Sequence, residues 1–221
     1  MILSRGRGYL FIHIPKTGGT ALTRALEARA RADDVIVADT PKGRARAARQ
    51  KGLPVRGRLW KHAMLADLDG WLDEDEIAGL FTLTLVRNPW DRLVSYYHWL
   101  RAQDFAHPHV ALAQSRDFSA FLNDPGVAAS LRAHPARRYM TTAAGVERAT
   151  LYARLEHLDQ DLGPFEAHLG FGLTPLPLEN RSERPRDWRG LYSDADAALV
   201  ADIAAEDIAR FGYGFDDGQV C

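Results

Sequence analysis

The sequence has few of the features that mark secreted or membrane-spanning proteins. Its single cysteine, Cys221, is the last residue, so no disulfide can form within the chain. No apolar run approaches the roughly 18 residues that a membrane-spanning helix needs. The first residues, MILSRGRGYLFIHIPK, lack a signal-peptide layout, because their apolar run is short and ends in Pro-Lys rather than at a small-residue cleavage site. We therefore expect a cytoplasmic protein without a membrane span.

The chain also lacks an excess of charge of either sign. It carries 28 basic and 29 acidic residues, a net charge of −1, and its isoelectric point is near 6.7. Such a balance argues against a protein that binds nucleic acid over its whole surface, so no nucleic-acid partner is expected. The length of 221 residues and the 46% hydrophobic content predict one globular domain over residues 1–221.

The segment YLFIHIPKTGGT lacks the Walker order of residues, in which the lysine follows the glycines. Tyr9–Ile14 is apolar and rich in β-branched residues, which predicts a buried strand. Gly18 and Gly19 allow a sharp turn, and helical spacing begins at Thr20. A strand, a glycine turn and a helix start direct backbone N–H groups at one point, where Lys16 adds a positive charge. This pattern predicts an anion site, most simply for phosphate, although an ordinary turn stays open as the alternative.

A second strand and helix are predicted in the segment FTLTLVRNPWDRLVSYYHWLR. Phe81–Val86 reads as a strand. Asn88 is a favourable helix N-cap, and Pro89 then takes the first helical position, where its missing N–H costs nothing. Asp91, three residues after Asn88, stands where a capping carboxylate belongs. A strand therefore leads through a turn into a helix for the second time in the chain.

Two polar residues of this segment indicate a second oxyanion site. Arg87 follows the strand, and Ser95 lies about two helical turns beyond the cap, so both can face the helix start. A structural salt bridge for Arg87 and a solvated hydroxyl for Ser95 remain alternatives. In open parallel sheets, ligands bind beyond the carboxyl ends of the strands. Two oxyanion sites at such ends suggest a ligand with two separated anionic groups.

The stretch Pro41–Lys61 contains eight basic residues and no acidic one. It allows three interpretations: a solvated loop and helix face, a mouth that attracts an anionic ligand, or a nucleic-acid surface. Metal binding is not expected anywhere in the chain. Four consecutive acids at 73–76 cannot converge on one face, and His98, His107 and His109 lack accompanying ligands.

The remaining pattern alternates strands and helices, which favours an α/β protein. Val35–Ala38 and Ala149–Leu155 are predicted strands. Glu156–Leu169 is a predicted helix that Gly163-Pro164 interrupts, and Asp194–Arg210 is a predicted helix that Ser193 caps.

Taken together, several segments resemble the sulfotransferase family that uses 3′-phosphoadenosine 5′-phosphosulfate (PAPS). They are most similar to the branch that includes heparan sulfate 2-O-sulfotransferase and its small bacterial relatives. The segments are Ile12–Thr20, Lys61-His62, Val86–Tyr97, Leu155–Leu158, Asn180–Ser182 and Asp207–Phe215. The resemblance implies a P-loop-like, three-layer α/β fold, whose central, mainly parallel sheet is flanked by helices.

The same resemblance implies roles for individual residues. The loop residues Lys16, Thr17, Gly18, Gly19 and Thr20 would hold the 5′-phosphosulfate, and Lys16 would neutralise the oxygen that bridges phosphate and sulfate. No metal is required for such a transfer. The product would be 3′,5′-adenosine bisphosphate (PAP), and the acceptor a hydroxyl, expected on a carbohydrate.

Other implied roles fall outside the glycine turn. Arg87 and Ser95 would bind the 3′-phosphate, and His62 would be the general base for the acceptor hydroxyl. Ser182 and Arg184 would close over the cofactor. Two other functions stay open on the sequence alone: a P-loop-like, nucleotide-dependent kinase that needs Mg²⁺, and a non-enzymatic anion-binding module that uses Pro41–Lys61.

Overall fold

The computed structural model describes residues 1–177 and 187–217. These residues form two compact units. The first comprises residues 1–86 and 136–177, and the second comprises residues 87–135 and 187–217. We describe each unit by itself, and the single domain over residues 1–221 stays a prediction.

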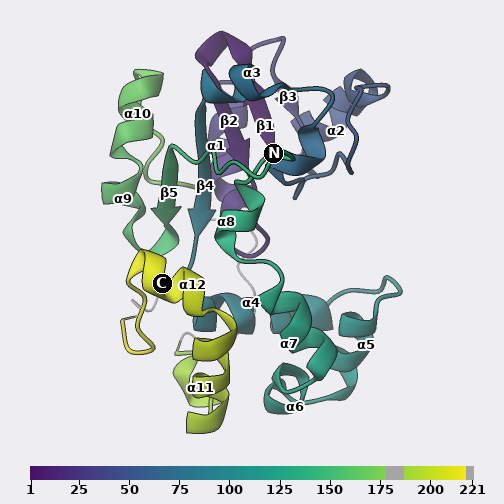
Figure 1. Ribbon diagram of the computed structural model, residues 1–221, viewed down its shortest axis with the longest axis vertical. Coiled ribbons are helices and arrows are strands. Elements are labelled where there is room, and N and C mark those ends of the chain that lie inside the picture. Colours follow the sequence, from purple (N-terminus) through teal and green to yellow (C-terminus); the bar gives the residue numbers. More distant parts are fainter. Residues whose placement is uncertain (178–186, 218–221) are drawn as a thin grey trace. The chain divides into compact units, whose positions relative to one another are not determined.

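The first unit is built on a five-stranded sheet (Figure 1). Its strands are β1 (Ile2–Ser4), β2 (Tyr9–Ile12), β3 (Val35–Ile36), β4 (Phe81–Val86) and β5 (Leu151–Arg154). The spatial order is β3-β1-β2-β4-β5. Strands β2, β4 and β5 run parallel, whereas β1 runs antiparallel to both of its neighbours. The predicted α/β class with a mainly parallel central sheet is confirmed.

The register of the parallel strands brings their carboxyl ends to one edge of the sheet. Ile12, the last residue of β2, pairs with Thr84 of β4, and Val86, the last residue of β4, pairs with Arg154 of β5. All four residues of β2 are buried, as expected for a strand that is covered on both faces. The segment after β2 therefore begins at an edge fixed by pairing and burial.

Helices flank this sheet (Figure 1). Those of the first unit are α1 (Gly19–Ala28), α2 (Pro41–Arg46), α3 (Glu74–Ala78), α8 (Ala136–Tyr139), α9 (Leu158–Asp161) and α10 (Gly163–Leu169). Leu22 and Leu26, one turn apart on α1, are buried in the sheet's core. The predicted interruption of the helix over Glu156–Leu169 is confirmed, because α9 ends at Asp161 and a new helix, α10, begins at Gly163 with a proline in its first turn.

The second unit is helical. Its helices are α4 (Pro89–Arg101), α5 (Pro108–Ser115), α6 (Phe118–Leu122), α7 (Pro125–Arg132), α11 (Asp194–Ile203) and α12 (Ala205–Phe211). The predicted start of α4 is confirmed: the Asn88 side chain accepts a hydrogen bond from the Trp90 backbone N–H at 3.1 Å, and Pro89 is the first helical residue. Among residues 1–177 and 187–217, no helix is long and apolar enough to cross a membrane.

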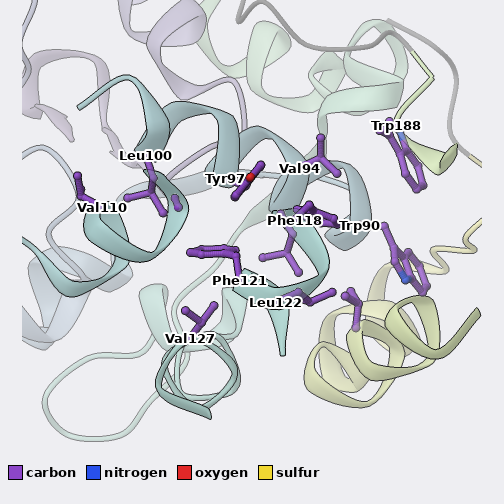
Figure 2. Packing of buried hydrophobic residues seen from close by; sticks show 13 residues of the cluster. Trp90, Val94, Tyr97, Leu100, Val110, Phe118, Phe121, Leu122, Val127 and Trp188 are labelled. Carbon is purple, nitrogen blue, oxygen red and sulfur yellow. The ribbon is translucent and has the colours of Figure 1, made fainter. Parts of the chain in front are cut away.

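Aromatic side chains fill the core of the second unit (Figure 2). Trp90 and Trp188 are almost fully buried. The Trp90 indole N–H donates to the Ala197 carbonyl at 3.0 Å, and the Tyr192 hydroxyl donates to the Trp90 carbonyl at 2.8 Å. These bonds satisfy polar atoms that burial would otherwise leave unpaired. The packing fixes the first turn of α4, which begins two residues after Arg87.

The single helix predicted over Asp194–Arg210 is wrong. Helix α11 ends at Ile203, Ala204 has φ −106° and ψ 20°, and α12 starts at Ala205. No glycine or proline marks this break, so a broad apolar stripe could not reveal it. The predicted cap is confirmed, since the Ser193 hydroxyl accepts from the Asp196 N–H at 3.1 Å.

Candidate active site

The glycine turn follows β2 and opens a helix, as predicted. Gly18 is the N-cap of α1 and has φ 82° and ψ 3°, a left-handed conformation that favours glycine. No side chain among the described residues caps this helix start, and its first turn contains no acidic residue. The positive end of this ten-residue helix therefore has no acidic side chain in its own first turn to neutralise it. Such an end is suited to a phosphate or another oxyanion.

Lys16 and Thr17 give the turn its shape. Lys16 has φ 68°, and no other non-glycine residue in the described part of the chain has a positive φ. A left-handed backbone at a non-glycine residue costs about 1–3 kcal/mol and is concentrated at functional sites. The buried Thr17 hydroxyl donates to the Ile14 carbonyl at 2.9 Å, so its proton holds the turn.

His13 was not singled out from the sequence, yet it lies against the glycine turn. A Cβ added to Gly19 would come within 2.2 Å of His13 Cδ2 and 2.5 Å of its Nε2. The imidazole is 7% exposed and stacks on Phe11 with ring centroids 5.9 Å apart. The absence of a side chain at Gly19 is thus required by the His13 ring, which occupies that space.

His62 is bound to the strand end that leads into this turn. Its Nδ1 lies 2.8 Å from the His13 backbone carbonyl, and the two imidazole centroids are 4.5 Å apart. A carbonyl oxygen can only accept, so Nδ1 carries the proton of the neutral ring. Nε2 is then the atom with the lone pair. This is the tautomer that a general base requires, with its orientation set by the partner of the other nitrogen.

Burial keeps both imidazoles neutral at physiological pH. It lowers the pKa of His62 to about 4, against the raising effect of the hydrogen bond to the His13 carbonyl, and nearby Lys61 lowers it further. Burial also holds the pKa of His13 well below its usual value, and the neighbouring His62 acts in the same direction. His62 can therefore accept a proton at neutral pH without first losing one.

The segment that carries His62 is fixed by backbone contacts. The Met1 nitrogen donates to the Lys61 carbonyl at 2.9 Å, and the Ala63 N–H donates to the Trp60 carbonyl at 3.0 Å. The Lys61 ammonium pairs with Asp39 at 2.5 Å. The predicted base thus stands on an anchored turn of the first unit.

The first part of the basic stretch Pro41–Lys61 serves the fold. Arg46 donates to the backbone carbonyls of Asp34 and Arg31, both at 2.8 Å, and Arg49 donates to the Ala32 carbonyl at 2.6 Å. These guanidinium groups hold the turn before β3. The predicted mouth for anionic ligands gains no support from them.

The second predicted oxyanion site lies at the start of α4. Arg87 Nε and Nη2 donate to one oxygen of Asp91 at 2.9 and 2.6 Å, and both side chains are about nine-tenths buried. The structure therefore contains the structural salt bridge that the sequence left open as the alternative for Arg87. Ser95 is buried one turn beyond Asp91, so the three residues recur at intervals of four on one face. An anion that binds Arg87 has to share its guanidinium with Asp91.

Two predicted site residues, Ser182 and Arg184, lie outside the described residues. Thr20 is the second residue of α1, which begins at Gly19. Within residues 1–177 and 187–217, no group of three or more histidine, cysteine or acidic side chains is placed to hold a metal ion.

We expect Gly19→Ala to destabilise the first unit. The new Cβ would overlap the buried His13 ring, and forcing extra atoms into a packed site costs about 1–3 kcal/mol. Urea unfolding should therefore show a lower midpoint for this variant. Gly163→Ala is the matched control, since nothing lies within 4 Å of the added Cβ at that position. Equal stability of the two variants would contradict the close packing of His13 on the turn.

Comparison with known proteins identifies the family of this chain. No curated protein matches it. In fold it is similar to the crystal structure of mouse sulfotransferase SULT7A1 complexed with PAP, with a TM-score of 0.52 and 17% identity over 93% of this chain and 86% of that one. A family model described as "Sulfotransferase family" matches residues 1–158. Since that match includes β2, the glycine turn, His62 and α4, and well over half of the residues, the chain belongs to the sulfotransferase family.

Proposed function

We propose that this protein transfers a sulfuryl group from PAPS to a hydroxyl of an acceptor, with His62 as the general base. The observation that carries the proposal is the bond from His62 Nδ1 to the His13 carbonyl, which leaves Nε2 as the proton acceptor beside the anion-binding turn. Family membership supports sulfuryl transfer. The structural neighbour SULT7A1, solved with PAP, supports PAPS as the donor.

The residues of the glycine turn fit the 5′ end of PAPS. Gly18 and Gly19 present backbone without side chains, and α1 directs its positive end at the same place. Lys16 supplies a full positive charge. When bound, PAPS provides an activated phosphosulfate bond. Arg87 and Ser95, at the start of α4, are the proposed partners of its 3′-phosphate, with Ser182 and Arg184 as further proposed contacts.

Two residues of the chain act on the transfer itself. His62 Nε2 takes the proton of the acceptor hydroxyl as that oxygen bonds to sulfur. Lys16 neutralises the charge that develops on the bridging oxygen as its bond to sulfur breaks. In such in-line displacements, the protein contributes chiefly positioning and charge neutralisation. A neutral histidine can perform the proton transfer at pH 7.

The acceptor is proposed to be a carbohydrate, on the resemblance of the sequence motifs to the heparan sulfate 2-O-sulfotransferase branch. That finer placement stays a prediction. Sulfuryl transfer itself does not depend on the kind of acceptor, because the proposed base can take the proton of any hydroxyl that reaches His62 Nε2 beside the bound donor.

We expect PAP to raise the melting temperature. A ligand at 100 times its dissociation constant stabilises by about 2.7 kcal/mol, which for a chain of this size is a shift of roughly 5–10 °C. A thermal-shift assay with PAP, and in parallel with ATP and Mg²⁺, measures this. Stabilisation by ATP and Mg²⁺ alone would overturn the proposal in favour of the kinase. With PAPS and a panel of glycans, mass spectrometry should then detect a sulfated product.

A further inference from the structure

An exposed tryptophan stands beside the proposed base. Trp60 is 36% exposed, one of the few large apolar side chains open to solvent in the described residues. Its ring contacts His62 at nearly a right angle, with centroids 5.1 Å apart. Large aromatic surfaces left open next to a reactive group are typical of ligand contacts. Neither the donor-binding turn nor the base mechanism uses this surface.

A guanidinium covers the same ring. The Arg58 Cζ lies 4.6 Å from the centroid of Trp60, a cation–π contact. Within the described part of the chain, Arg58 has no ion pair with a carboxylate. Its neighbour Arg56 does, since it pairs with Asp69 at 3.0 Å. Arg58 therefore keeps a positive charge available for an anion.

The backbone around Arg58 is anchored. The Gly57 N–H donates to the Asp67 carbonyl at 3.1 Å, and the Arg58 N–H donates to the Asp67 carboxylate at 3.3 Å. A Cβ at Gly57 would come within 2.4 Å of Asp67 Cα, so the two segments are in close contact. Together with the bonded turn from Trp60 to Ala63, these contacts hold the backbone of both residues in place before any ligand binds.

We propose that Arg58 and Trp60 form the acceptor subsite and select a sugar ring that carries an anionic group. The inference rests on the proposed function, since it places the acceptor hydroxyl at His62. The indole offers an apolar surface for the ring of the sugar. The planar guanidinium binds a carboxylate or sulfate oxygen pair on that ring. Arg58 and Trp60 thus discriminate acidic from neutral acceptors.

The test measures acceptor binding directly. Tetragalacturonic acid and its methyl ester share one sugar backbone, and the ester replaces each carboxylate by a neutral group that is one methyl larger. Saturation-transfer NMR on protein saturated with PAP gives the dissociation constant of each. We expect the acid to bind about tenfold more tightly than the ester. Arg58→Gln should remove this preference. Trp60→Ala should weaken the binding of both ligands about fivefold to tenfold, and Trp60→Phe should weaken it less.

A second pair of the same kind serves as the control. Arg5 lies over the Trp71 ring, 5.6 Å from its centroid, but it is paired with Glu76 at 2.6 Å. Arg5→Gln and Trp71→Ala should leave acceptor affinity unchanged. Equal binding of acid and ester, or unchanged affinity in the Arg58 and Trp60 variants, would overturn the inference. Each variant is checked for stabilisation by PAP. Absence of that stabilisation in the unmodified protein would instead count against the proposed function.

Discussion

Replacement of His62 by asparagine should lower kcat by about 10²- to 10⁴-fold, the usual contribution of a general base. Asparagine can still donate a hydrogen bond to the His13 carbonyl from its amide, but it has no basic nitrogen. The variant therefore separates the positioning of this segment from proton transfer. Turnover is measured as sulfated product formed from PAPS by mass spectrometry, with stabilisation by PAP as the check that the donor still binds.

The pH dependence of the unmodified protein gives an independent view of the same residue. A base must be deprotonated to act, and burial lowers the pKa of His62 to about 4. The value of kcat/KM should therefore stay level as the pH falls through 6.5 and decrease only as it approaches 4. An activity loss centred near 6.5, or full turnover in His62→Asn, would remove His62 from the role of base.

Replacement of Lys16 by alanine should lower turnover about 10- to 100-fold. Hydrogen bonds to charged groups contribute about 1.5–3 kcal/mol, and Lys16 is proposed to neutralise charge that develops during the transfer. Alanine retains a Cβ, so the left-handed backbone at this position acquires no new strain. The rate with PAPS and the melting shift with PAP together separate a loss of catalysis from a loss of binding.

The exposed Lys51 provides the matched control for that variant. Lys51→Ala removes one positive charge from the same unit and should leave the rate unchanged. If both alanine variants behaved alike, the lysine of the turn would have no special place in the reaction. The non-enzymatic anion-binding module would be favoured instead if Lys16→Ala bound PAP and sulfate as tightly as the unmodified protein does, with affinities that fall strongly as the salt concentration rises.

Elements with strong local signals were predictable from the sequence. The strand predicted over Phe81–Val86 has the bounds of β4, and the Asn88-Pro89 start of α4 is as expected. Both depend on neighbouring residues alone: a short apolar run, a capping side chain and a proline at its preferred place. In contrast, β1 was missed, because three residues carry too little pattern to indicate a strand without its partners.

The site was predictable only where its residues are close in sequence. His13 lies in a run that reads as buried strand, and its contact with His62 joins positions 49 residues apart. Arg87 and Asp91 are four apart, so their pairing was within reach of helix periodicity. The sequence left a structural salt bridge open as the alternative for Arg87, but it assigned Asp91 to the helix cap and so did not identify it as the partner.

The basic stretch shows a further limit of sequence patterns. Charge composition left attraction of anions open as one interpretation, but two of its arginines, Arg46 and Arg49, donate to backbone carbonyls of residues 31–34. Carbonyl partners have no sequence signature, because every residue has one. Arg58, which lies over an aromatic ring and pairs with no carboxylate among the described residues, is the residue of this stretch for which we propose that property.

The double role of His13 affects the entropy of the reaction. Its carbonyl holds the proposed base, and its ring fills the space over Gly19 in the anion-binding turn. His13, at the end of one strand, therefore sets the positions of both the proposed base and the anion-binding turn before substrates bind. Two independent loops would lose conformational entropy in each catalytic cycle when they align the base with the donor. Here that entropy is lost when the protein folds, so alignment contributes less to the activation free energy.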